Sequence, residues 1–165
     1  MKRSPRLTAC AVSFLLLASF AALGEVETSI AIASGELGMR RAVPRSLGIE
    51  IQGRGPWRWS VIRPVTGVLT SSSGGAYLYS GVVAELPLPA GFQLSPGFAP
   101  GLVLATGDRD LGSPLEFRSS IELSIAPMDT LRLGVGFSHI SNGGLTRHNP
   151  GVEMLTFSVA IPLRR

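Results

Sequence analysis

The stretch LEFRSSIELSI, residues 115–125, alternates apolar and polar side chains along almost its whole length. The apolar parity holds Leu115, Phe117, Ile121, Leu123 and Ile125. Only Ser119 interrupts that side. Because successive residues of a β-strand point to opposite faces, the pattern predicts a strand with one apolar and one polar face.

Segments of similar character fill the chain after residue 24. Clusters rich in Gly, Pro, Ser and Asp separate them, and no long segment has the 3.6-residue period of a helix. The expected strands cover residues 28–37, 46–54, 57–69, 75–86, 91–104, 115–126, 130–141 and 152–163. The sequence therefore predicts an all-β protein.

The number of strands and the lengths of their connections favour one architecture. An even number of strands, with long connections alternating with short ones toward the end, is typical of an outer-membrane barrel. Four charged residues on polar faces would suit the ion-paired interior of a small barrel, namely Glu116, Arg118, Glu122 and Arg132. The fold class that we expect is an eight-stranded antiparallel transmembrane β-barrel.

The aromatic residues fit the predicted strands less regularly. Four of them are expected as interfacial girdle residues, namely Trp57, Trp59, Tyr77 and Tyr79. Within the segment 57–69, however, Arg63 shares the parity of the two tryptophans. Either a bulge or a wrong strand boundary would explain this conflict, and the sequence leaves both open.

The first 24 residues have the pattern of a cleaved secretory signal. A basic start precedes an apolar run that ends in small residues. The run of about 15 residues is shorter than the roughly 20 that a membrane-spanning helix needs. Cys10, the only cysteine, lies in this segment, so residues 25–165 are expected to form a single barrel domain without a disulfide or a thiolate metal site.

The charge of the chain gives little support for a nucleic-acid partner. The formal net charge is +4, from 15 basic and 11 acidic residues. Loss of Lys2, Arg3 and Arg6 with the signal would leave 12 basic against 11 acidic residues. The remaining arginines are scattered rather than clustered, so no nucleic-acid binding is expected.

His139, Ser141 and Glu153 are three residue types of a catalytic triad on one predicted hairpin. Residues i and i+2 of a strand lie about 6.6 Å apart on the same face, so the side chains of His139 and Ser141 can meet. If His139 pairs with Glu153, then Ser141 faces Gly151. In that register four apolar residues, Phe137, Val135, Leu133 and Leu131, face Leu155, Phe157, Val159 and Ile161.

These residue types suit ester hydrolysis. Serine is a weak nucleophile until a neighbouring base takes its proton, and a carboxylate can hold the imidazole in the required tautomer. Because the three side chains share the apolar face of the hairpin, the predicted substrate is a lipid.

The full motif is His139-x-Ser141-Asn142, then six residues, then Asn149-x-Gly151-x-Glu153. It closely resembles the lipid A 3-O-deacylase family of Gram-negative outer membranes, the PagL type. The resemblance implies Ser141 as nucleophile, His139 as general base and Glu153 as the orienting acid. It further implies that Asn142 and Asn149 shape the oxyanion site together with loop amides. In the predicted register, Gly151 faces Ser141, and its missing side chain would leave room for an acyl ester.

The resemblance also implies partners and location. The substrate would be lipid A or lipopolysaccharide in the outer leaflet of the outer membrane, and the protein would need no cofactor and no metal. Membrane lipid would surround the barrel, and a homodimer is left open. Two alternatives remain at this stage: an inactive barrel with a structural or binding role, and a soluble periplasmic lipid-binding β-protein.

Overall fold

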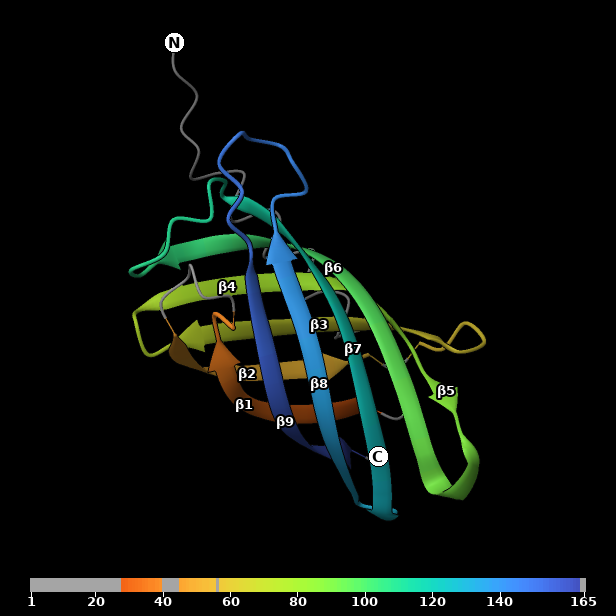
Figure 1. The fold of residues 1–165 in the computed structure, drawn as a ribbon. Coiled ribbons are helices and arrows are strands. Elements are labelled where there is room, and N and C mark those ends of the chain that lie inside the picture. The colour runs from red at the N-terminus through yellow and green to blue at the C-terminus, as the bar shows by residue number, and fades with distance from the viewer. Residues whose placement is uncertain (1–27, 40–44, 56, 164–165) are drawn as a thin grey trace.

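Each long strand carries side chains that alternate between two faces, and eight such strands close into a barrel (Figure 1). The computed structural model describes residues 28–39, 45–55 and 57–163. The long strands are β1 (Thr28–Leu37), β2 (Ser46–Arg54), β3 (Ile62–Ser71), β4 (Gly75–Ala84), β6 (Phe92–Thr106), β7 (Leu115–Met128), β8 (Leu131–Ser141) and β9 (Val152–Leu163). The expected signal segment lies outside the described residues.

All pairings in the sheet are antiparallel, and the β4–β6 pairing closes the ring. A two-residue strand, β5 (Leu86–Pro87), follows β4 and also pairs with β6, and a 3₁₀ turn, η1 (Pro89–Gly91), leads into β6. The expected eight-stranded antiparallel barrel is confirmed. Within the described residues, no helix has the length and apolar character that a bilayer crossing requires.

The two ends of the barrel differ. At the "loop end", the segments 107–114 and 142–151 connect β6 to β7 and β8 to β9. At the "terminal end", β1 begins and β9 finishes, and shorter turns connect β2 to β3 and β7 to β8.

The outward surface of the barrel is apolar. Exposed large apolar residues include Ile49, Ile51, Ile121, Leu123, Val135, Leu155, Phe157, Val159 and Ile161. Phe157 is 66% exposed and alternates with buried Thr156 and Ser158. In a soluble protein, the apolar side chains would face the interior and the polar side chains would face the solvent. The apolar exterior therefore disfavours the soluble alternative.

The interior of the barrel holds ion pairs, with an apolar cluster near the loop end. Arg118 pairs with Glu50 at 3.1 Å, and Arg54 pairs with Glu122 at 2.7 Å. Arg132 donates to Ser124 Oγ at 3.3 Å. The expected interior placement of Glu116, Arg118, Glu122 and Arg132 is confirmed.

The girdle assignment of Tyr77 and Tyr79 is wrong. Both rings are buried inside the barrel, with exposures of 4% and 1%. The Tyr79 hydroxyl lies over Gly67, which has no side chain, and donates to the carboxylate of Glu50. These tyrosines therefore face inward because their hydroxyls have polar partners in the interior.

The third strand begins later than predicted. Trp57 and Trp59 are exposed in the segment before β3, and Trp59 and Ile62 exchange two backbone hydrogen bonds of 3.0 Å. Ser60 takes a φ of 57° in this turn. The strand starts at Ile62, so Arg63 faces the interior and its parity conflict with the tryptophans disappears.

Candidate active site

The register of β8 and β9 is the predicted one over most of its length. His139 pairs with Glu153, and Phe137, Val135 and Leu133 pair with Leu155, Phe157 and Val159. The ladder runs from Arg132↔Ala160 to Ile140↔Val152, so neither the predicted Leu131–Ile161 pair nor the Ser141–Gly151 pair belongs to it. Gly151 has a φ of +60°, which turns the chain out of the ladder.

His139 and Glu153 form a contact on the outward face of this hairpin. His139 Nδ1 lies 3.2 Å from Glu153 Oε1. Glu153 is only 7% exposed, although its parity is that of the apolar exterior. A carboxylate at Nδ1 favours the tautomer with its proton there, which leaves Nε2 as an acceptor for a serine proton.

Gly151 lies directly against the imidazole. A Cβ at this position would be 2.9 Å from His139 Cε1 and 3.5 Å from His139 Nε2. The absence of a side chain therefore lets the imidazole lie against the backbone. Gly151 is in this way a neighbour of His139 rather than a ladder partner of Ser141.

Ser141 ends β8 on the face that carries His139, and it pairs with Phe117 of β7. The side chain is partly exposed, and within the described residues no hydrogen bond joins it to His139. Catalytic hydrogen bonds are often loose without substrate. The structure thus joins two of the three predicted triad residues and places the third two positions along the same strand.

Ser119 is a polar neighbour of the site that the sequence reasoning left out. It is the direct ladder partner of His139 on β7, and it is exposed on the outward surface. The signal was present in the sequence, because Ser119 is the one interruption of the apolar parity in residues 115–125. A single strand could not show that this interruption lies beside His139.

Asn142 organises the loop that follows Ser141. Its side chain is fully buried. The amide nitrogen Nδ2 donates to the Leu111 carbonyl at 3.2 Å, to Thr146 Oγ1 at 2.9 Å and to the His148 carbonyl at 2.9 Å. Its Oδ1 accepts from the Gly144 amide at 3.0 Å. The side chain is therefore engaged within the loops rather than directed at the face of His139.

Asn149 completes this arrangement from the other side of the loop. Its Oδ1 accepts the Asn142 backbone N–H at 3.1 Å. The Gly143 amide, in contrast, has no hydrogen-bond partner among the described residues. Gly143 and Gly144 both have positive φ, 64° and 85°, which places two successive amides in a tight turn beside Ser141.

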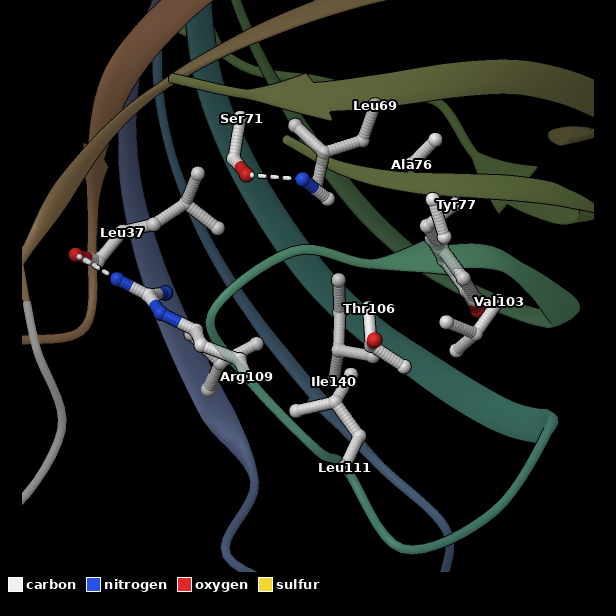
Figure 2. A pocket seen from close by; sticks show the side chains of 13 residues that line it. Leu37, Leu69, Ser71, Ala76, Tyr77, Val103, Thr106, Arg109, Leu111 and Ile140 are labelled. Carbon is white, nitrogen blue, oxygen red and sulfur yellow. Dashed lines mark hydrogen bonds between the residues drawn. The ribbon is translucent and has the colours of Figure 1, made fainter. Parts of the chain in front are cut away.

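The segment 107–114 supports this loop. His148 Nε2 donates to the Asp110 carbonyl at 3.2 Å. At the loop end of the barrel, Arg109 Nη2 donates to the Leu37 carbonyl at 3.3 Å (Figure 2). Burial lowers the pKa of Arg109, although the neighbouring Asp108 favours its charged form. Arg109 is partly buried against β1.

An apolar cavity lies inside the barrel below Arg109 (Figure 2). It has a volume of about 50 Å³ and is lined mainly by Leu37, Leu69, Tyr77, Val103, Leu111 and Ile140. Ile140 and Val152 point into it, whereas their strand neighbours His139 and Glu153 face outward. Among the described residues, no group of three or more His, Cys, Asp and Glu side chains is arranged to hold a metal ion.

Comparisons with known proteins match most of the barrel. The family described as Lipid A 3-O-deacylase (PagL) matches residues 47–162. The solved structure of the outer membrane enzyme PagL is similar, with 22% identity, a TM-score of 0.62 and coverage of 82% of this chain and 99% of that chain. No curated protein has a sequence that matches this chain.

Two further solved structures share the fold. Neisserial surface protein A (NspA) is 12% identical, with a TM-score of 0.63 and coverage of 83% of this chain and 97% of that chain. A de novo designed transmembrane β-barrel is 10% identical, with a TM-score of 0.59 and coverage of 86% and 98%. These likenesses confirm the transmembrane barrel fold.

Proposed function

Because the chain belongs to the lipid A 3-O-deacylase family, we propose that it is a serine esterase that hydrolyses the acyl chain at position 3 of lipid A. It is an integral β-barrel of the outer membrane, and residues 25–165 would be its mature domain. The observation that carries the proposal is the 3.2 Å contact between His139 Nδ1 and Glu153 Oε1 on the outward face. Polar groups are costly on a surface that faces lipid, so this pair is expected to have a function.

The proposed reaction uses Ser141 as nucleophile and His139 as base. Ser141 Oγ attacks the ester carbonyl carbon while its proton passes to His139 Nε2. The bond from that carbon to the sugar oxygen at position 3 then breaks, and His139 returns the proton to this oxygen. Water attacks the acyl-serine in the same way, which releases a free fatty acid and restores Ser141. Glu153 keeps the other imidazole proton on Nδ1 throughout.

The negative charge on the carbonyl oxygen requires hydrogen-bond donors. We assign this role to the amides of the loop after Ser141, with the Gly143 N–H as the first candidate because it has no partner within the described residues. Asn142 and Asn149 would then act by holding the loop in shape. Removing one donor of this kind raises a barrier by about 3–4 kcal/mol.

The depth of the site suits an outer-leaflet substrate. A strand needs about 9–11 residues to cross the hydrocarbon layer. His139 and Ser141 lie among the last residues of β8, close to the loop end. With that end outside the cell, the triad would lie near the level of the ester groups of lipid A, and the apolar surface formed by Phe137 and Leu155 would contact acyl chains.

Expression of the protein in a Gram-negative host, followed by mass spectrometry of its lipid A, tests the proposal. The wild-type chain should remove one acyl chain, from position 3. Ser141→Ala should slow this reaction by at least about 10³-fold, because the covalent intermediate can no longer form. Two matched controls are available: Ser119→Ala, outward beside His139, and Ser138→Ala, buried on the opposite face of β8.

Both control variants should deacylate at close to the wild-type rate. Folding of each barrel would be checked by its heat-dependent mobility on gels. An unchanged acyl count with a folded wild-type barrel would support the inactive-barrel alternative. Loss of activity in Ser119→Ala with retention in Ser141→Ala would assign the nucleophile to β7 instead.

A further inference from the structure

A second, polar cavity lies inside the barrel at the terminal end, far from His139. Its volume is about 280 Å³. Its polar lining consists of Arg54, Arg58, Arg63, Glu85, Gln93, Asp129 and Arg132. We call it the terminal chamber. None of its lining residues belongs to the proposed esterase site.

Within the terminal chamber, one carboxylate is shared by three arginines. The guanidinium groups of Arg54, Arg58 and Arg63 each lie 3.3 Å from an oxygen of Glu85. Arg54 has a second carboxylate partner, Glu122, at 2.7 Å. Arg58 and Arg63 therefore share the single carboxylate of Glu85.

Arg132 contributes a fourth guanidinium group to the chamber. In the part of the chain that the structure describes, no carboxylate forms an ion pair with it. Among the described residues, its hydrogen bond is to the Ser124 hydroxyl at 3.3 Å. A guanidinium has five N–H donors, so most of those on Arg132 remain available. Asp129 lies exposed at the rim, and the described carboxylates of this region, Glu85, Glu122 and Asp129, are fewer than the four arginines.

We propose that the terminal chamber binds an anion that bears a phosphate group, held by Arg58 and Arg132. Phosphate oxygens accept the paired N–H donors that arginine presents, and partial enclosure by the barrel strengthens such contacts. The chamber is large enough for a phosphate with its waters or for a phosphodiester headgroup. With the terminal end toward the periplasm, the source would be soluble phosphate or an inner-leaflet phospholipid.

The first arm of the test uses inorganic phosphate. The thermal unfolding of the full chain in a neutral detergent is followed at pH 7 in phosphate and in sodium chloride of equal ionic strength. Phosphate should raise the unfolding temperature in a saturable way. In Arg132→Gln and in Arg58→Gln, the phosphate concentration at the midpoint of this rise should be about tenfold higher, since each variant loses a charged donor. Arg45→Gln, an exposed arginine at the loop end, should respond like the wild type.

The second arm uses lipid. The protein is placed in nanodiscs of phosphatidylcholine with a minor fraction of phosphatidylglycerol, is extracted in mild detergent, and its bound lipid is measured by mass spectrometry. Phosphatidylglycerol should be enriched in the wild type and in Arg45→Gln, and depleted in Arg132→Gln and Arg58→Gln. A response in the first arm alone identifies free phosphate, and a response in the second identifies a lipid headgroup.

Two outcomes would overturn the proposal. One is an equal unfolding temperature in phosphate and chloride together with no enrichment of phosphatidylglycerol in the wild type. The other is a wild-type response in both Arg132→Gln and Arg58→Gln. Arg58 is half exposed in a turn, so its variant keeps the test decisive if Arg132→Gln fails to fold. The result does not depend on esterase activity.

Discussion

The imidazole of His139 lies between a carboxylate and a glycine. Glu153 fixes one side through Nδ1, and Gly151 lies against the Cε1 edge. Gly151 meets two requirements at this place, because its φ of +60° disfavours other residues and because a Cβ would be 2.9 Å from Cε1. The position of the proposed base therefore depends on a residue that has no reactive group of its own.

Gly151→Ala should displace the imidazole and lower kcat by about tenfold or more, since small misplacements of a catalytic group are costly. The left-handed backbone should also reduce stability by about 1–2 kcal/mol. Gly91→Ala is the matched control, because Gly91 has a φ of +77° and an added Cβ would meet no atom within 4 Å. Deacylation rates that fall equally in both variants would show that strain, and not contact with His139, causes the effect.

Asn142→Ala should loosen the loop that carries the proposed oxyanion donors. The variant loses both N–H donors of Nδ2, which three acceptors share, and one accepted hydrogen bond, so a local destabilisation of about 2–4 kcal/mol is expected. Hydrogen exchange of amides in residues 142–149 would report it. Thr146→Val removes a smaller part of the same network, so it should give a smaller increase in the exchange rates of these amides. Unchanged exchange in Asn142→Ala would contradict this role.

The strands that could be predicted from the sequence are those with clear turn residues at both ends. The bounds of β1, β2 and β9 agree with the sequence prediction. The start of β3 does not, because alternation continues through Trp57 and Trp59 across a turn, and only the parity of Arg63 indicated the error. Local periodicity cannot show where a ladder begins.

The site was predictable to the extent that it is local. His139 and Glu153 could be paired because both flanking strands alternate and a single loop joins them. The contact from Asn142 to the Leu111 carbonyl could not be found, since it joins segments 31 residues apart through a loop of irregular shape. Ser119 was visible as an exception in one strand, but its place beside His139 depends on the β7–β8 register.

The turn between β2 and β3 holds both tryptophans of the chain. Trp59 is 82% exposed, and the turn lies at the terminal end of the apolar surface. Indole rings favour the boundary between headgroups and hydrocarbon. In vesicles, tryptophan fluorescence should therefore be quenched more by lipids brominated near the headgroup than by lipids brominated deep in the acyl chain. Quenching by aqueous iodide with no effect of either lipid would contradict this placement.

The barrel as a whole combines an apolar exterior with a charged interior. Arg118 contacts both oxygens of Glu50, which is 2% exposed, and its guanidinium carbon lies 4.9 Å from the centre of the Tyr79 ring. Each charge was removed from water on folding, so each depends on the other. This dependence makes the interior sensitive to the loss of one partner.

Arg118→Gln should destabilise the barrel by about 3–5 kcal/mol, because Glu50 would remain buried without its cation. The double variant Glu50→Gln, Arg118→Gln should recover part of that loss. Arg45→Gln removes an exposed pair with Glu36 and should cost below about 1 kcal/mol. Urea unfolding in vesicles measures all three, and equal midpoints for Arg118→Gln and Arg45→Gln would argue against a stabilising interior pair.

The proposed function depends on an outward Ser141, served by His139 and Glu153, as the nucleophile of an ester hydrolase. Reaction of the purified, folded barrel with a long-chain fluorophosphonate, followed by peptide mass mapping, would identify that nucleophile. We expect one adduct, on Ser141, that is lost in His139→Gln and retained in Ser119→Ala. An adduct on Ser119, or equal labelling of Ser141 with and without His139, would disprove the assignment.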